Sequence, residues 1–158
     1  MPELPEVETV RRGLADLLPG QAVVRATVFD SPKNFPNSPT DVQQFLYGAH
    51  VTAVRRRAKV LMIDLDTRYS LVTHLKMTGQ LIFRGANSFA GGHPNDSLIG
   101  ELPDRSTRVQ IDFTDGSHLF FNDQRKFGWM KLMPTDEIEN LPFMQKVGPE
   151  PLDKKTKA

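Results

Sequence analysis

The sequence predicts an α+β protein that is mainly β, built as an antiparallel β-sandwich flanked by an N-terminal helix and a C-terminal helix. Short apolar or alternating runs recur from residue 22 to residue 133 and are separated by turn residues, as in the meanders of sandwiches and barrels. Sustained helical periodicity occurs near the two ends of the chain. At 158 residues, with 39% hydrophobic and 25% charged residues, the chain has the size and composition of one globular domain.

The first predicted element is an amphipathic helix. Apolar residues recur at helical spacing between residues 6 and 18, and a Pro-Gly pair at 19–20 ends the run. Proline suits the first turn of a helix because its missing N–H needs no partner there, and carboxylates are favoured near a helix N-terminus. These rules account for Pro5 and for three acidic residues, but they leave Pro2 unexplained. The acidic residues are Glu3, Glu6 and Glu8.

The strands are expected in eight segments. These are residues 22–30, 50–58, 59–66, 70–77, 80–85, 107–113, 118–123 and 129–133. A short helical turn is expected at 41–48. Residues 85–104 are rich in Gly, Pro, Asn, Asp and Ser, which predicts a long surface loop outside the sheets. Residues 135–145 read as a helix capped by Thr135 or Asp136.

Composition limits the function classes. The absence of cysteine excludes disulfides, thiolate zinc sites and a cysteine nucleophile. No apolar run reaches membrane length and no signal peptide opens the chain, so a cytoplasmic location is expected. The net charge of +1 means that a basic surface would have to come from local clustering. The histidines lack metal-ligand spacing, so no metal site is expected. They are His50, His74, His93 and His118.

Pro2 is the residue with the clearest chemical potential. If Met1 is removed, Pro2 becomes an N-terminal secondary amine, and an α-amine with a pKa near 8 is partly unprotonated at neutral pH. Such an amine can attack a sugar C1′ or an aldehyde, and Glu3 beside it can carry protons. Judged by residue type alone, Pro2 and Glu3 have an alternative interpretation, in which they only form the start of a helix.

Five segments, in order, resemble bacterial formamidopyrimidine-DNA glycosylase. The opening "PELPEVET" is followed by "RRRAKVLMIDL", "THLKMTGQL", "TDGSHLFFNDQRKFG" and "VGPEPLD". The resemblance covers nearly the whole chain. The chain resembles the family's N-terminal catalytic domain alone. It assigns residues 1–148 to that domain and 149–158 to the start of an interdomain linker. The helix-two-turn-helix and zinc-finger domains of the family would follow, and zinc is expected only in that finger, so no cofactor is expected in this chain.

The resemblance implies a bifunctional base-excision repair enzyme. It would remove oxidised purines, such as 8-oxoguanine and formamidopyrimidines, through a Schiff base on the N-terminal proline, and would cut the strand by β,δ-elimination. The implied partner is double-stranded DNA with an oxidised base or abasic site, bound by a monomer and without a membrane. The implied catalytic residues are Pro2, Glu3, Glu6 and Lys59. The implied DNA-binding residues are His74, Met77, Arg105, Ser106, Arg125 and Phe127.

Several alternatives stay open at this point. Residue types alone favour core positions for Met77 and Phe127, and a solvated strand face for the "RRRAK" stretch. The segment "RSTR" at 105–108 replaces a Lys-His-x-His motif, so Ser106 stands where a DNA-contacting histidine is common. An endonuclease VIII-like enzyme for oxidised pyrimidines and a non-catalytic DNA-binding or damage-sensing module are rival functions. The isolated fragment is expected to bind DNA weakly and to be weak or inactive.

Overall fold

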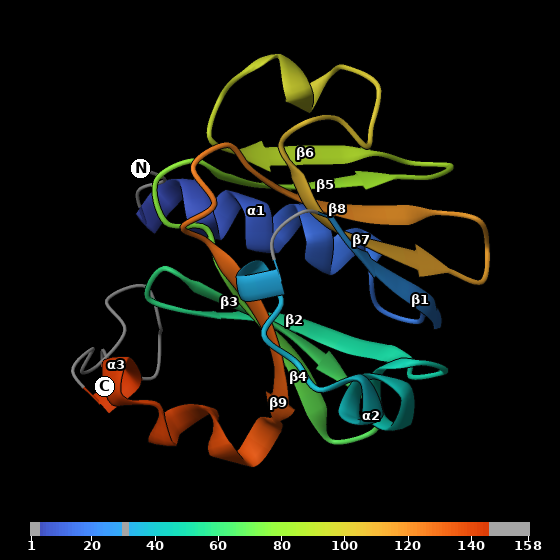
Figure 1. Cartoon of the computed structure of the whole chain (residues 1–158), viewed down its shortest axis with the longest axis vertical. Helices are drawn as coiled ribbons and strands as arrows, with labels where there is room; N and C mark the ends of the chain where they lie inside the picture. The colour runs from blue at the N-terminus through green and yellow to red at the C-terminus, as the bar shows by residue number, and fades with distance from the viewer. Residues whose placement is uncertain (1–3, 30–31, 146–158) are drawn as a thin grey trace.

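The computed structural model describes residues 4–29 and 32–145, which form two antiparallel sheets and several short helices (Figure 1). The five-stranded sheet has the order β1-β7-β8-β5-β6, and its strands are β1 (Val23–Val28), β7 (Thr107–Phe113), β8 (His118–Asp123), β5 (Gly79–Arg84) and β6 (Phe89–Gly92). The four-stranded sheet has the order β2-β3-β4-β9, and its strands are β2 (Val51–Arg57), β3 (Val60–Leu65), β4 (Tyr69–His74) and β9 (Trp129–Pro134). The predicted fold class is confirmed.

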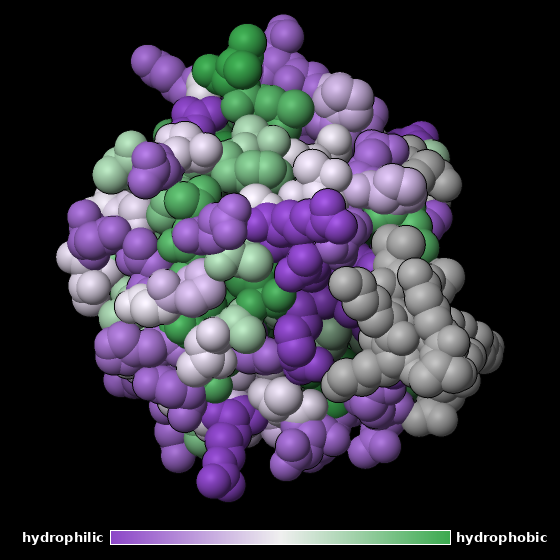
Figure 2. Space-filling model, turned by 180° about the vertical axis from the view of Figure 1, so that it is seen from behind, coloured by the Kyte–Doolittle hydropathy of each residue, from purple (hydrophilic) through white to green (hydrophobic). Residues whose placement is uncertain are grey.

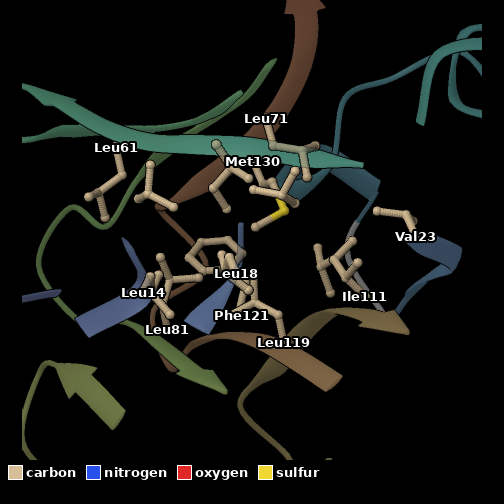
Figure 3. Packing of buried hydrophobic residues seen from close by; sticks show 14 of the residues in the cluster. Leu14, Leu18, Val23, Leu61, Leu71, Leu81, Ile111, Leu119, Phe121 and Met130 are labelled. Atoms are coloured by element: carbon tan, nitrogen blue, oxygen red, sulfur yellow. The ribbon is translucent and has the colours of Figure 1, made fainter. Parts of the chain in front are cut away.

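The main core lies between the two sheets and α1 (Leu4–Leu17), as Figure 3 shows. Its fully buried side chains come from the helix and from both sheets, and include Leu14, Leu18, Leu61, Leu71, Leu81 and Phe121. A second, smaller cluster covers the other face of the four-stranded sheet with Val60, Met62, Val72, Met133, Ile138 and Met144. Because both faces of β3 are covered, its sequence is a nearly continuous apolar run instead of an alternating one.

The helix α1 lies against both sheets, contacting β2 of one and β6 of the other. It begins and ends within two residues of the predicted boundaries and buries Val7, Val10 and Leu14. None of the helices within residues 4–29 and 32–145 combines the length and the apolar character needed to cross a membrane. On the face in Figure 2, hydrophilic and hydrophobic side chains are mixed, and strongly hydrophilic ones run through its middle.

The strand β6 corrects the prediction that residues 85–104 lie wholly outside the sheets. It pairs with β5 in antiparallel register, with Phe83 opposite Phe89. The glycines that suggested a loop have a packing reason, because α1 crosses closely over β6. A β-carbon at Gly91 would lie only 2.7 Å from Val10 Cγ2, so this strand position needs a residue without a side chain.

The remaining short helices differ in detail from the prediction. The turn expected at 41–48 is a short α2 (Pro39–Asp41) that continues into the π-helical turn η2 (Val42–Leu46). The helix expected at 135–145 is a 3₁₀ helix, η4 (Thr135–Asn140), followed by the one-turn α3 (Pro142–Gln145). Pro134 occupies the N-cap and no side chain caps η4, so the caps assigned to Thr135 or Asp136 were wrong. Pro142 has no N–H to continue the first segment, which explains the break.

Candidate functional site

Three of the predicted DNA-binding residues meet on two neighbouring loops. Met77 lies between β4 and β5, and Arg125 and Phe127 lie between β8 and β9. The Arg125 Nη1 atom is 3.7 Å from Met77 Sδ, and the Arg125 guanidinium lies 5.8 Å from the centre of the Phe127 ring. Met77 is 43% exposed and Phe127 is 57% exposed, so the interpretation of both as core residues was wrong. We call these three residues the wedge cluster.

The buried carboxylate of Asp123 organises the backbone beneath the wedge cluster. Its Oδ1 accepts a hydrogen bond from the Arg125 N–H at 3.1 Å and another from the Thr78 hydroxyl, while its Oδ2 accepts from the Gly128 N–H at 2.5 Å. Gly128 lies so close to its neighbours that a β-carbon there would be 2.8 Å from both Asp123 Oδ2 and the His74 carbonyl oxygen. The loop therefore turns tightly over Asp123 and projects Phe127 outwards.

His74 ends β4 beside this loop. Burial of the ring, and secondly the positive charges of Lys76 and Lys59, lower the pKa of His74 from 6.5 to about 4. The ring is therefore neutral at pH 7. Its Nδ1 accepts a hydrogen bond from the Lys76 N–H at 3.0 Å, so the remaining proton is on Nε2, which can act as a donor. Such a donor suits a phosphate oxygen.

We expect His74 to make folding stability dependent on pH. Its folded-state pKa of about 4 lies below its ordinary 6.5, so the unfolded chain binds more protons between these values and stability is lost as the pH falls through this window. We expect the unfolding free energy, measured with urea, to decrease less between pH 7 and pH 5 in His74→Gln than in the unmodified chain. NMR titration of the ring should give the low pKa directly, and a pKa near 6.5 would contradict the described burial.

Lys59 lies in the turn that joins β2 to β3, at the same end of the sheet as His74. Val60, the next residue, is paired with His74 in the register of β3 and β4. The Lys59 charge is close enough to lower the pKa of His74. In Figure 1 this turn, the loop after β4 and the loop after β8 all lie at the end of the molecule where α1 begins. The predicted site residues on these segments are thus brought to one end of the fold.

The catalytic residues predicted on the N-terminal helix are only partly within the described chain. Pro2 and Glu3 lie outside the described residues. Glu6 is exposed on the first turn of α1.

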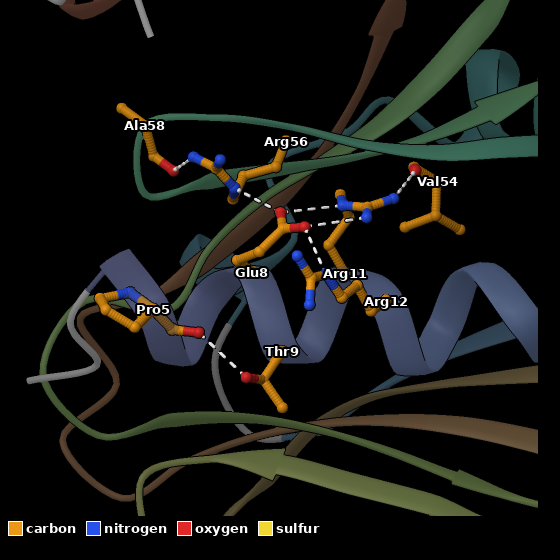
Figure 4. Close-up of polar contacts among 8 residues, drawn as sticks. All are labelled: Pro5, Glu8, Thr9, Arg11, Arg12, Val54, Arg56 and Ala58. Carbon is orange, nitrogen blue, oxygen red and sulfur yellow. Dashed lines mark hydrogen bonds and ion pairs between the residues drawn. The ribbon is translucent and has the colours of Figure 1, made fainter. Parts of the chain in front are cut away.

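Glu8 has a structural role in ion pairing (Figure 4). The sequence alone explains this residue only as a carboxylate favoured near a helix N-terminus. Its carboxylate accepts hydrogen bonds at 2.9 Å from Arg11, Arg12 and Arg56. The hydrogen bond from Arg11 is the largest cause that lowers the pKa of Glu8 from 4.5 to about 2, against the effect of burial. The spacing of Glu8 to Arg11 and Arg12 is a local signal of ion pairs, but the pairing with Arg56 on β2 is long-range.

Arg56 connects this helix to the turn that presents Lys59. Its guanidinium, 5% exposed, bonds Glu8 through Nε and donates through Nη1 to the Ala58 carbonyl oxygen at 2.9 Å. Ala58 has a left-handed backbone, with φ of 52°, and directly precedes Lys59. The interpretation of "RRRAK" as merely a solvated strand face is therefore wrong for Arg56. Hydrogen bonds run from α1 through Arg56 to the backbone next to Lys59.

Arg105 and Ser106 lie beside the wedge cluster but in different environments. Arg105 is exposed, whereas Ser106 is buried and its hydroxyl donates to Asp104 Oδ1 at 2.7 Å. Burial would raise the pKa of Asp104, but the hydrogen bonds from Ser97 and Ser106 outweigh it and lower the pKa. These residues line an open polar pocket that also includes Gln124, the neighbour of Arg125. In the structure, Ser106 shapes this pocket and does not offer a free hydroxyl at the surface.

Comparison with known proteins places this arrangement in a family. The sequence profile of the formamidopyrimidine-DNA glycosylase N-terminal domain matches residues 1–130. Formamidopyrimidine-DNA glycosylases from a Jannaschia species and from Dinoroseobacter shibae are 42% and 38% identical over 154 and 152 residues. Each match covers 96% of this chain and 52% of the relative, so the chain spans about half the length of these relatives.

Solved structures agree with the sequence comparison. A Lactococcus lactis formamidopyrimidine-DNA glycosylase bound to DNA containing N7-benzyl-Fapy-dG matches with a TM-score of 0.73 and 28% identity, covering 92% of this chain and 48% of that one. The same enzyme bound non-covalently to DNA with an abasic site matches with a TM-score of 0.72, covering 91% and 49%. The sequence profile, the relatives and the fold therefore agree, and the chain belongs to the formamidopyrimidine-DNA glycosylase N-terminal domain family.

Proposed function

We propose that this chain supplies the catalytic domain of a bifunctional DNA glycosylase and abasic-site lyase that removes oxidised purines from double-stranded DNA. The wedge cluster is the observation that carries the proposal. Exposed apolar side chains that lie together can mark a binding site, and here two of them flank an arginine on tightly held loops. The solved relatives bound to damaged DNA support a nucleic-acid partner.

The wedge cluster has the chemistry needed to open a duplex locally. A damaged base must leave the base stack before an enzyme can act on its glycosidic bond. In this proposal Phe127 inserts between bases, Met77 fills the space that the extruded base leaves, and Arg125 donates hydrogen bonds to the orphaned base or to phosphates. His74, Lys59 and Arg105 contact phosphates around the extruded nucleotide, with Ser106 shaping the pocket beside them.

The proposed reaction uses the N-terminal amine and the carboxylates near it. The Pro2 nitrogen attacks C1′ as the bond from C1′ to the base breaks, and the base leaves with a proton while the nitrogen loses its own. Opening of the sugar ring gives an iminium on Pro2. Removal of a C2′ proton then expels the 3′ phosphate, and a second elimination expels the 5′ phosphate. Glu3 carries protons, Glu6 supports the site and Lys59 holds phosphate and assists proton transfer.

We also propose that the chain works as a monomer in the cytoplasm and needs no metal or cofactor of its own. The absence of cysteine from the sequence excludes thiolate ligands for a metal in this chain.

Phe127→Ala tests the role of the wedge cluster in this proposal. We expect it to lower the preference for a duplex with an abasic-site analogue over undamaged duplex by about tenfold, because base–aromatic stacking contributes roughly 1–3 kcal/mol. The melting temperature should hardly change, because the ring is 57% exposed. Fluorescence anisotropy at low salt measures both affinities.

Ile99→Ala is the matched control, since Ile99 is another exposed apolar residue, 87% exposed, that lies outside the wedge cluster. It should leave the preference unchanged. Equal effects of the two substitutions would count against the wedge, and a large drop in stability for Phe127→Ala alone would restore a packing role for this ring.

A further inference from the structure

The loop that bears Phe127 is held from a second side by Asn34. This residue ends the 3₁₀ turn η1 (Pro32–Asn34) and is fully buried. Its Nδ2 donates to the Lys126 carbonyl oxygen at 3.1 Å and to the Gly128 carbonyl oxygen at 2.5 Å, although the partners are 92 and 94 residues away in the sequence. Asn34 thus binds the carbonyl groups that flank Phe127.

Asp123 binds the amide groups of the same loop. It accepts from the N–H groups of Arg125 and Gly128, as described above, while Asn34 donates to the carbonyls. The backbone of residues 125–128 is therefore hydrogen-bonded through both kinds of polar group, and the Phe127 ring between these anchors points into solvent. Lys126, between the anchors, has a left-handed backbone with φ of 61°, a conformation that needs support from surrounding contacts.

Thr78 extends the same network to the neighbouring loop. Its hydroxyl donates to Asp123 Oδ1 and accepts a hydrogen bond from the Arg125 N–H at 3.2 Å. Thr78 directly follows Met77, so the position of Met77 is tied to the position of Arg125. The three members of the wedge cluster rest on one connected set of hydrogen bonds.

We propose that Asn34 and Asp123 act as a clamp that fixes the wedge cluster before DNA arrives, and that Asn34 is a positioning residue for lesion discrimination. This inference rests on the proposed function. A side chain that must enter a duplex loses less conformational freedom on binding if its backbone is already fixed, and a group held in its bound geometry binds more selectively.

The hydrogen bonds of the Asn34 side chain are directed to one place. Its Nδ2 donates both of its bonds to the loop that bears Phe127, whereas its buried Oδ1 has no hydrogen-bond partner among the described residues. An apolar residue at this position would leave the two carbonyl groups of the loop without this donor. Loss of the amide should therefore affect this loop first.

Asn34→Ala tests the clamp, with Asn37→Ala as the matched control. Asn37 comes from the same loop and also bonds distant backbone, because its Nδ2 donates to the Met130 carbonyl oxygen at 3.3 Å and its Oδ1 accepts from the Leu132 N–H at 2.8 Å. Those bonds reach β9 and not the loop that bears Phe127. Both substitutions remove two hydrogen bonds, but only Asn34→Ala should free the wedge cluster.

Two measurements on the 158-residue chain separate the clamp from general stability. Hydrogen exchange of the Arg125 and Gly128 amides should be about tenfold faster in Asn34→Ala than in Asn37→Ala, because local opening loses two stabilising bonds. The affinity ratio of an abasic-analogue duplex to undamaged duplex should fall about tenfold in Asn34→Ala and stay within about twofold in Asn37→Ala. Trp129, the single tryptophan, adjoins Gly128, and its fluorescence gives a further probe of the loop.

Each outcome decides a different point. Equal amide exchange in the two variants would overturn the clamp. A loosened loop with full lesion preference would overturn the positioning role of Asn34. A loosened loop in Asn34→Ala, with no lesion preference even in the unmodified chain, would support the clamp and contradict a role of Asn34 in lesion discrimination by this chain. If Asn34→Ala does not fold, Thr78→Val, which keeps the side-chain volume, should still speed exchange at Arg125, and unchanged exchange there would overturn the shared network.

Discussion

Extension of the chain before Pro2 is expected to abolish its covalent trapping on abasic-site DNA by borohydride. Any residue joined to Pro2, including a retained Met1, converts the secondary amine into an amide nitrogen that is no longer nucleophilic. The proposed iminium then has no nitrogen from which to form. Trapping should fall to the level of a protein-free reaction. The reaction is measured with protein in excess over DNA and at low salt, because phosphate contacts weaken as salt rises.

The matched control is the same chain with Met1 removed, verified by intact mass. Lys59→Ala in this form should reduce the rate but leave the trapped product, because Lys59 is proposed to hold phosphate and to assist proton transfer. Undiminished trapping of the extended chain would assign the nucleophile to an amine other than that of Pro2, either a lysine or the new N-terminus, and trapping that depends on Lys59 would assign it to that lysine. If neither form is trapped while binding still depends on Phe127, the chain would be a DNA-binding module without lyase chemistry.

Local pattern was sufficient to predict most of the fold. The strands from Val51 to His74 were predictable because each apolar run is bounded by turn residues, and the boundaries of α1 follow from its periodicity and its Pro-Gly stop. β6 was missed because its glycines are explained by a distant contact: the space at Gly91 is taken up by Val10 of α1. The sequence around Gly91 does not indicate that α1 packs there, so its composition favoured a loop.

The candidate site shows the same division between local and distant information. The resemblance selected Met77, Arg125 and Phe127, while residue type alone favoured a core position for two of them. Neither the resemblance nor residue type pointed to Asn34 and Asp123 as supports of the site. Asn34 binds carbonyl groups more than 90 residues away, and Asp123 acts on backbone N–H groups whose direction depends on the folded loop. Only the tertiary structure identifies these supports.

Removal of the Glu8 carboxylate is expected to produce a large loss of stability for a polar residue of α1. In Glu8→Ala, the Arg56 guanidinium would lose its bond to the Glu8 carboxylate while its side chain remains 5% exposed, and breaking a buried ion pair costs about 3–5 kcal/mol. We expect about 3 kcal/mol, because Glu8 itself is 16% exposed and Arg12 can turn into solvent. Urea unfolding measures the difference. Asp16→Ala, which removes an exposed acid from the same helix, should change stability by no more than about 0.5 kcal/mol.

The pH dependence of Glu8→Gln distinguishes this ion-pair network from simple packing. The pKa of Glu8 is about 2 in the folded chain and 4.5 ordinarily, so between these values the unfolded chain binds more protons. The stability that the carboxylate provides is therefore fully present above pH 4.5 and is lost as the pH falls towards 2. The difference in unfolding free energy between the unmodified chain and Glu8→Gln should be constant from pH 7 to pH 5 and should shrink at lower pH. Glutamine has nearly the same shape as glutamate, so a difference that stayed constant down to pH 2.5 would show that Glu8 acts through packing and that its charge does not hold α1 to the turn before Lys59.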